Sequence, residues 1–116
     1  MLETTLGSLR LKNPVLSASG TFGSGWEGRT FSDLSRVGAL VSKTVTLRPR
    51  HGNPPPRIWE TPSGMLNSIG LENKGVERFL ADTLPKMRTL GPKIVINIGG
   101  EAIEDFVRLE IGRAHV

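Results

Sequence analysis

Three short apolar runs divide the chain, and each one ends at a glycine or a polar residue. They cover residues 14–19, 39–43 and 93–100. Continuous apolar runs of this length are typical of strands that are buried on both faces of a parallel sheet. The pattern predicts three such strands, and the third is the clearest because it is rich in β-branched side chains.

Two segments that follow these runs carry apolar residues at helical spacing. Residues 30–37 are expected to form a short helix that stops before a glycine. Residues 74–90 carry a longer apolar stripe, with Asn73 placed to cap the helix. Pro85 falls within this stripe and is expected to break or restart the helix, because proline lacks the N–H and crowds the preceding turn.

A hairpin and a last helix complete the expected order. Residues 2–12 alternate on either side of Gly7-Ser8 and predict two short strands. Residues 102–109 predict a helix with three side chains facing inward: Ile103, Phe106 and Val107. Strands alternating with helices indicate an α/β fold built of βαβ units. That order fits an open three-stranded sheet or the start of a (βα)8 TIM barrel, which needs about 250 residues.

The stretch between the second strand and the long helix, residues 44–72, shows no clear helical or strand period. In a compact domain a connection of this length is usually a lid, a binding loop or disorder. Its apolar side chains are too many for a solvated tether: Ile58, Trp59, Met65, Leu66, Ile69 and Leu71. We therefore expect a folded loop that covers a site.

The charge of the chain is unevenly spread. There are 15 basic and 11 acidic residues, for a net charge of +4, and one group of cations has no acid between its members: Lys43, Arg48, Arg50 and Arg57. Such a group attracts phosphate, carboxylate or nucleic acid. It lacks the interleaved aromatic residues of stacking sites, so we expect no nucleic-acid partner.

The residue types that are missing exclude several classes of protein. The chain has no cysteine, which excludes a disulfide framework or a thiolate metal site within it and fits a reducing compartment. The two histidines lie far apart, and we expect no metal site. No apolar run approaches the length of a membrane span, and the first residues do not resemble a signal peptide. A soluble cytoplasmic protein is expected.

Each predicted strand ends near a polar side chain: Ser19, Lys43 or Asn97. Ligands bind at the carboxyl ends of strands in parallel sheets and barrels, so we expect these side chains to face a common cavity, roofed by the segment around Asn67. A simpler interpretation is that strand ends tolerate polar residues because water is near. Lys43 is the most informative, since an ammonium at the mouth of a barrel needs an anion or a group that becomes one.

Asparagine and glycine residues add to this candidate site. The amides of Asn67 and Asn97 suit a heterocycle with alternating N–H and C=O groups, although asparagines in loops are more often turn formers. Gly20 allows a ligand to approach the backbone closely. The Gly99-Gly100 pair does not fit Gly-x-Gly-x-x-Gly, and neither a metal constellation nor a Ser-His-Asp arrangement can be assembled.

Several ordered motifs together resemble those of one flavoenzyme family. They are Lys12-Asn13-Pro14, Ala18-Ser19-Gly20, Lys43-Thr44, Gly52-Asn53-Pro54 with Pro56-Arg57, Gly64-Met65-Leu66-Asn67-Ser68-Ile69-Gly70-Leu71 with Asn73, and Ile96-Asn97. Over residues 2–109 the chain resembles the N-terminal part of class 1, cytosolic dihydroorotate dehydrogenases, FMN enzymes on a TIM barrel. Met-Leu-Asn before Ser-Ile-Gly-Leu is more similar to the NAD-linked 1B subtype than to the fumarate-using one.

The resemblance implies roles for individual residues. The residues implied to contact FMN are Ala18, Ser19, Gly20, Lys43, Thr44 and Asn97. Those implied to bind the substrate are Lys43, Asn67, Ser68, Ile69, Gly70 and Leu71.

The implied reaction oxidises (S)-dihydroorotate to orotate in de novo pyrimidine (UMP) biosynthesis. A proton leaves C5 and a hydride passes from C6 to the flavin. The fixed positive charge of Lys43 would stabilise negative charge on the reduced ring. The 1B subtype further implies an iron–sulfur subunit that carries FAD and relays electrons, within a homodimer or heterotetramer.

The chain departs from the family pattern in two ways. The catalytic base of the family is a cysteine further along the barrel, and this chain has none. We therefore expect residues 1–109 to be the N-terminal part of a barrel that is inactive alone and folds poorly, because an unclosed barrel exposes a strand edge. Residues 110–116 depart from the helical pattern and are interpreted as a non-native, adapter-like tail, or else as an ordinary helix that ends at Gly112.

Two other functions stay open from the sequence. One is another FMN barrel oxidoreductase, such as a dihydropyrimidine dehydrogenase domain, which differs by whether a cysteine base follows the fourth strand. The other is a non-catalytic α/β module that binds an anion. Tight binding of FMN and orotate by these residues alone would favour the module.

Overall fold

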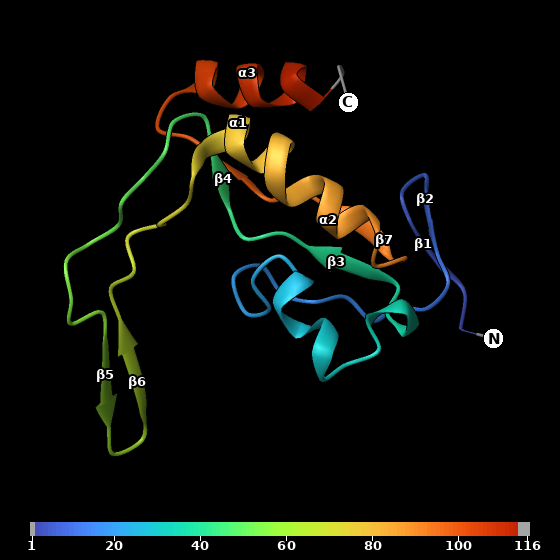
Figure 1. Ribbon diagram of the computed structural model, residues 1–116, viewed down its shortest axis with the longest axis horizontal. Coiled ribbons are helices and arrows are strands. Elements are labelled where there is room, and N and C mark those ends of the chain that lie inside the picture. The colour runs from blue at the N-terminus through green and yellow to red at the C-terminus, as the bar shows by residue number, and fades with distance from the viewer. Residues whose placement is uncertain (1, 114–116) are drawn as a thin grey trace.

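A computed structural model describes residues 2–113 and has two parallel strand lines at its centre (Figure 1). In one line β3 (Ala39–Val41) is followed by β4 (Val45–Thr46), and in the other β7 (Lys93–Val95) is followed by β8 (Ile98–Gly99). β3 pairs with β7 and β4 pairs with β8, both in parallel. The predicted second strand is confirmed, whereas the predicted third strand is divided into two pieces.

The predicted first strand, residues 14–19, is only an extended segment beside β3. Leu16 makes a single parallel bridge to Ala39, and the amide of Ser17 donates to the carbonyl of Ala39 at 3.3 Å. Val15 is 56% exposed, so the expectation of a buried strand is wrong. On the side away from β3, the segment of residues 14–19 has no neighbouring strand among residues 2–113. Pro14 would offer no N–H to such a neighbour.

One continuous helical stretch precedes β7 in the chain. It comprises α1 (Gly75–Arg78), the π-helical turn η3 (Phe79–Thr83) and α2 (Leu84–Arg88). Pro85 lies in the first turn of α2, where the α-helix starts again after the π-helical turn, so the predicted restart of the helix is confirmed. A proline removes one hydrogen bond to the preceding turn, and the wide π-helical turn just before it absorbs that loss.

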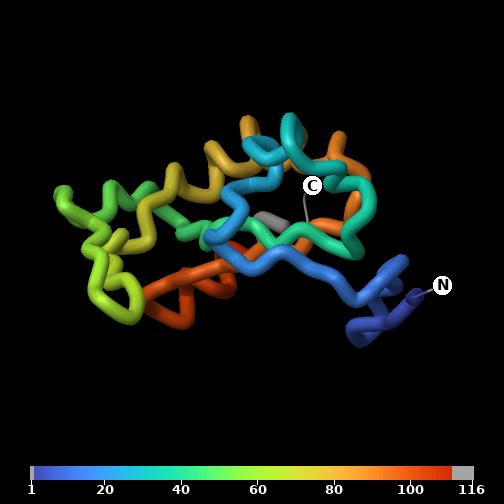
Figure 2. Tube along the Cα trace, turned by 90° about the horizontal axis from the view of Figure 1, so that it is seen from below, coloured from blue at the N-terminus to red at the C-terminus, as the bar shows by residue number. Residues whose placement is uncertain are grey.

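The core lies between this helical stretch and the strand line of β3 and β4. Its buried side chains come from both and from the segment just before β3: Leu34, Leu40, Val45, Phe79, Leu84 and Met87. Figure 2 shows the helical stretch and the segment that contains Leu34 on the same side of the strands. The long helix is therefore the element that fixes the strands in place.

Residues 26–36 form two short 3₁₀ turns instead of the predicted helix over residues 30–37. They are η1 (Trp26–Thr30) and η2 (Leu34–Arg36). Asp33 separates them, because its carboxylate accepts hydrogen bonds from the N–H and the hydroxyl of Ser35 and starts a new turn there.

The predicted hairpin at the N-terminus is confirmed. β1 (Thr4–Leu6) and β2 (Leu9–Leu11) are antiparallel, with Leu6 opposite Leu9. Gly7 has a φ of 59°, a conformation that glycine adopts without steric cost.

The long connection forms an arm, defined here as residues 50–73, that contains a second hairpin. β5 (Ile58–Thr61) and β6 (Gly64–Asn67) are antiparallel, and all of their residues are exposed. In Figure 1 this hairpin extends away from the rest of the molecule. The expectations of a stretch without strands and of a loop that covers the site are both wrong. The Pro62-Ser63 turn followed by Gly64 is the sequence signal that would have indicated a hairpin.

The last helix, α3 (Ile103–Arg113), follows β8 and contacts it, and Figure 2 shows it on the opposite side of the strands from the long helical stretch. Leu109 is buried, whereas Ile103 is 79% exposed and Phe106 and Val107 are also exposed, so the predicted inward face is wrong. No element between residues 2 and 113 covers that face. The helix continues through Arg113, and residues 114–116 of the expected tail lie outside the described residues.

Candidate functional site

Polar side chains from three neighbouring segments meet at the middle of the strand lines. The amide nitrogen of Asn97 donates to Ser19 Oγ at 2.7 Å and to Thr44 Oγ1 at 2.9 Å. Ser19 Oγ in turn donates to the carbonyl of Ser42 at 2.9 Å. We call these four residues the strand-end cluster. The predicted approach of Ser19 to Asn97 is therefore present in the structure.

Ser42 explains why the strand lines are interrupted at this level. Its buried hydroxyl accepts a hydrogen bond from the backbone N–H of Asn97 at 3.1 Å, where a regular ladder would use a carbonyl. Beyond the interruption the N–H of Val45 donates to the carbonyl of Asn97 at 2.9 Å. Ser42 was not among the predicted site residues, although a serine inside an apolar run is a visible signal in the sequence.

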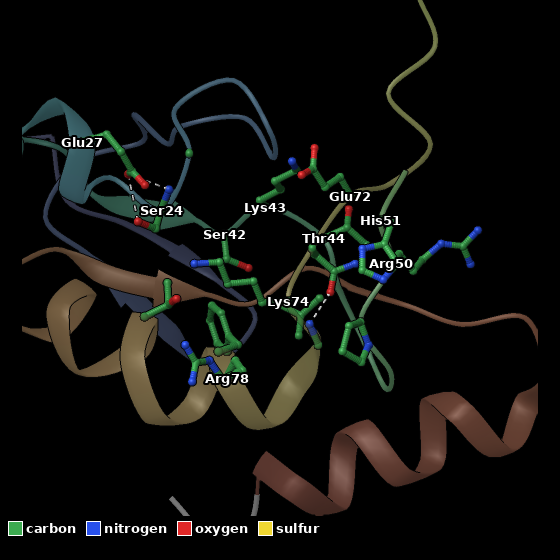
Figure 3. Close-up of a pocket in the computed structure, with 17 residues that line it drawn as sticks. Ser24, Glu27, Ser42, Lys43, Thr44, Arg50, His51, Glu72, Lys74 and Arg78 are labelled. Carbon is green, nitrogen blue, oxygen red and sulfur yellow. Dashed lines mark hydrogen bonds between the residues drawn. The ribbon is translucent and has the colours of Figure 1, made fainter. Parts of the chain in front are cut away.

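Lys43 is exposed and lines a cavity of about 570 Å³. Thr44, whose hydroxyl accepts from Asn97, lines the same cavity, whereas Ser19 and Asn97 do not. Figure 3 shows the charged residues that line this cavity. The cations are Lys43, Arg50, Lys74 and Arg78, with His51 beside them, and the carboxylates are Glu27 and Glu72. The excess of cations suits an anionic ligand.

The two carboxylates of the cavity remain ionised. A hydrogen bond from Arg57, followed by the charge of Arg57, lowers the pKa of Glu72, and the charges of Lys43 and His51 add to this effect. Burial alone would raise the pKa of Glu27, but hydrogen bonds from its own backbone and from Ser24 outweigh it and lower the pKa. The cavity thus offers paired charges as well as free hydrogen-bond donors.

The base of the arm is held by Arg57. Its guanidinium donates to the carbonyl of Asn53 at 2.6 Å and to the carbonyl of His51 at 2.9 Å, and it forms an ion pair with Glu72. Arg57 is only 26% exposed, so this ion pair is better shielded from water than an ordinary surface pair.

Residues 67–71, the predicted substrate segment, lie along the arm and not over the cavity. The N–H of Ser68 donates to the carbonyl of Arg57 at 2.7 Å, and Asn53 contacts Ser68 Oγ at 2.8 Å. Asn67 ends β6 and is exposed. None of residues 67–71 lines the cavity beside Lys43. The expected roof over that cavity is therefore wrong in this structure.

The described part of the chain was also compared with the geometry of metal sites and membrane-spanning helices. Within residues 2–113 no three acidic or histidine side chains gather as metal ligands would. In the same range no helix has both the length and the apolar character needed to cross a bilayer.

Comparison with known proteins decides which family carries these motifs. The family model described as dihydroorotate dehydrogenase matches residues 1–111. The chain belongs to this family. The match covers almost the whole chain and includes the residues of both the strand-end cluster and the arm.

Individual dihydroorotate dehydrogenases are similar over most of the chain. The "Dihydroorotate dehydrogenase B (NAD(+)), catalytic subunit" of Thermoanaerobacter sp. (strain X514) is 51% identical over 105 residues, which are 90% of this chain and 35% of the relative. The proteins of the same name from Bacteroides thetaiotaomicron and Desulforudis audaxviator are 48% and 51% identical, covering 92% and 90% of this chain. The chain spans about a third of the length of these relatives.

The side chains at the strand ends fit a flat flavin ring. Gly20 has a φ of 76°, and no atom lies within 4 Å of the place where a Cβ would stand, so a ligand has room to approach the backbone. Ser19 and Thr44 supply hydroxyls, and the amide oxygen of Asn97 accepts no hydrogen bond from any residue between 2 and 113. Donors, acceptors and open space together are what a heterocycle with N–H and C=O groups requires.

Proposed function

We propose that the protein to which these residues belong oxidises (S)-dihydroorotate to orotate with FMN, in pyrimidine biosynthesis. The observation that carries the proposal is the strand-end cluster beside Lys43, in a chain that belongs to the dihydroorotate dehydrogenase family. The names of the relatives from Thermoanaerobacter and Bacteroides favour the NAD-linked B type over the fumarate-using type. The family match also favours this function over a dihydropyrimidine dehydrogenase domain or a simple anion-binding module.

Residues at the strand ends would hold FMN, which when bound supplies the acceptor for the substrate's electrons. The proposed contacts are Ala18, Ser19, Gly20, Lys43, Thr44 and Asn97. Asn97 is held by its two hydroxyl partners, so its amide oxygen is aimed before any ligand binds. Lys43 is a fixed positive charge that would favour negative charge developing nearby.

The substrate would lie between Lys43 and the arm. The proposed substrate contacts are Lys43, Asn67, Ser68, Ile69, Gly70 and Leu71. Because residues 67–71 do not line the cavity beside Lys43, this role requires the arm to move toward Lys43 when substrate binds.

The wider organisation is also a proposal. We infer that residues 1–109 form part of a TIM barrel, since the parallel pairs β3–β7 and β4–β8 are joined by a helix as in such barrels. Residues 110–116 are proposed to be a non-native tail. The "catalytic subunit" names of relatives support a separate electron-transfer partner, proposed to carry an iron–sulfur cluster and FAD. We place the assembly, a homodimer or heterotetramer, in the cytoplasm.

A chimera tests this function. Residues 1–109 would replace the matching part of the Thermoanaerobacter sp. catalytic subunit, which supplies the other two thirds of its length. The purified chimera is expected to contain FMN and to bleach its flavin absorbance when dihydroorotate is added without oxygen. A chimera that binds FMN but is not reduced by dihydroorotate would contradict the proposal.

A further inference from the structure

Asn73 lies where the end of β4, the base of the arm and the start of α1 meet. Its Oδ1 accepts from the N–H of Thr46 at 3.2 Å and from the N–H of Gly75 at 2.9 Å. Its Nδ2 donates to Thr46 Oγ1 and to the carbonyl of Leu71, both at 2.9 Å. Its backbone pairs with Arg50 in both directions, at 2.9 and 3.0 Å. Both the donor and the acceptor of this amide are therefore engaged.

Leu71, one of the bonded partners, has an unusual backbone conformation. Its φ is 54°, and it is the only non-glycine residue with a positive φ among residues 2–113. This conformation is unfavourable for a residue with a Cβ and persists where surrounding contacts enforce it. The bond from Asn73 to the carbonyl of Leu71 is such a contact, so the path of the arm at this point depends on Asn73.

The other partner, Thr46, connects Asn73 to the strand-end cluster. Thr46 is buried and stands two residues after Thr44, whose hydroxyl accepts from Asn97. β4, which contains Thr46, is paired with β8 directly after Asn97. A displacement at Asn73 therefore changes how the arm is placed relative to Lys43 and Thr44.

We propose that Asn73 is a positioning residue that holds residues 67–71 in register with the end of β4. The inference rests on the proposed function, in which this segment binds substrate. Asn73 acts through the Leu71 carbonyl and through Thr46. A simpler role would be to cap α1, and that role needs only the bond from Gly75 to Oδ1.

The variant Asn73→Asp separates these two roles. It keeps the oxygen that accepts from Gly75 and replaces the donor facing the Leu71 carbonyl with an acceptor. Asn13→Asp is the matched control. Asn13 accepts from the N–H two residues later, at Val15, and donates to the carbonyl of Arg36, so the same bonds change far from the arm.

Both variants would be made in the chimera described above. Asn73→Asp is expected to raise the KM for dihydroorotate by about tenfold, the effect of losing one or two hydrogen bonds, with FMN content unchanged. Asn13→Asp is expected to leave the KM unchanged. Peptides covering residues 64–72 are expected to exchange amide hydrogens faster in Asn73→Asp alone.

An unchanged KM in Asn73→Asp, with or without a lower thermal midpoint, would overturn the inference and leave only a capping role. If the parent chimera binds FMN but does not oxidise dihydroorotate, the proposed function fails separately. Amide hydrogen exchange over residues 64–72 then tests the role of Asn73 by itself. Equal exchange rates in the parent chimera and in Asn73→Asp would overturn the inference that Asn73 positions this segment.

Discussion

In the strand-end cluster, Asn97 bonds to hydroxyls from two neighbouring segments, whereas residues 67–71 in the arm depend on side chains at the arm's base. The cluster is held by the strand lines and the core, so its geometry exists before a ligand arrives. The arm carries an exposed hairpin and is attached at one end. In the proposed function, cofactor binding would therefore fall to the region held by the core, and substrate binding to an arm that moves.

The largest effect is expected from Lys43. In the chimera, Lys43→Ala should slow reduction of the flavin by dihydroorotate about 10²–10³-fold, because a fixed charge at the reacting group is lost. Stopped-flow absorbance without oxygen measures this rate. Lys86→Ala, on the exposed side of α2, is the control and should keep the parent rate. A near-normal rate in Lys43→Ala would remove Lys43 from the mechanism.

Asn97 tests the rigidity of the cluster. Asn97→Ala should lower the free energy of unfolding by about 1–3 kcal/mol, since it leaves the hydroxyls of Ser19 and Thr44 without their donor. Urea denaturation measures the change. Asn67→Ala, on the exposed arm, should stay within about 0.5 kcal/mol of the parent. Equal losses in both variants would abolish the distinction between the two regions.

Arg57 tests how the arm is attached. Arg57→Ala should destabilise the arm by about 1 kcal/mol, because it removes an ion pair and two bonds to backbone carbonyls. Amide exchange over residues 58–67 should become about fivefold faster while exchange in α2 is unchanged. Faster exchange in α2 as well would show that the arm and the core unfold together.

Glu72 makes the attachment of the arm dependent on pH. Arg57 lowers the pKa of Glu72, so the ion pair stabilises the arm above the ordinary glutamate pKa of about 4.3 and is lost as the pH falls through the lowered value. Protection factors in the arm, in which the intrinsic pH dependence of amide exchange is divided out, should therefore fall on acidification below that range. Glu72→Gln should remove this pH dependence, and a fall in protection that persists in Glu72→Gln would assign it to another group.

The smallest effect is expected at Trp59. Its side chain is 68% exposed on the hairpin, so Trp59→Ala should change the free energy of unfolding by no more than about 0.5 kcal/mol. Urea denaturation measures this change. A loss above 1 kcal/mol would mean that the hairpin packs against another surface in solution.

The sequence predicted which residues meet at the strand ends better than it predicted the course of the strands themselves. Ser19 and Asn97 meet as expected because the carboxyl ends of parallel strands share one edge, a rule that needs only the positions of the apolar runs. The interruption of the strand lines could not be predicted, because it depends on the Ser42 hydroxyl reaching an amide 55 residues away in sequence.

Other differences have local causes. Pro85 was expected to break or restart the helix, and α2 does start there, but spacing alone does not reveal that the turn before it widens into a π-helical turn. The hairpin of the arm was missed because its two strands are fully exposed and therefore lack an alternation of apolar and polar residues. The positions of residues 67–71 follow from that hairpin, so the prediction that they lie over the cavity was wrong for the same reason.

The Ser42 hydroxyl has a consequence for anyone who transplants this site into another scaffold. It substitutes for a main-chain carbonyl, so copying the residues proposed to touch the ligand, Ser19, Thr44 and Asn97, would omit the group that accepts the Asn97 N–H. An alanine at that position would have nearly the right volume but would leave a half-buried amide without its partner. A successful graft must therefore include a serine that contacts no ligand itself.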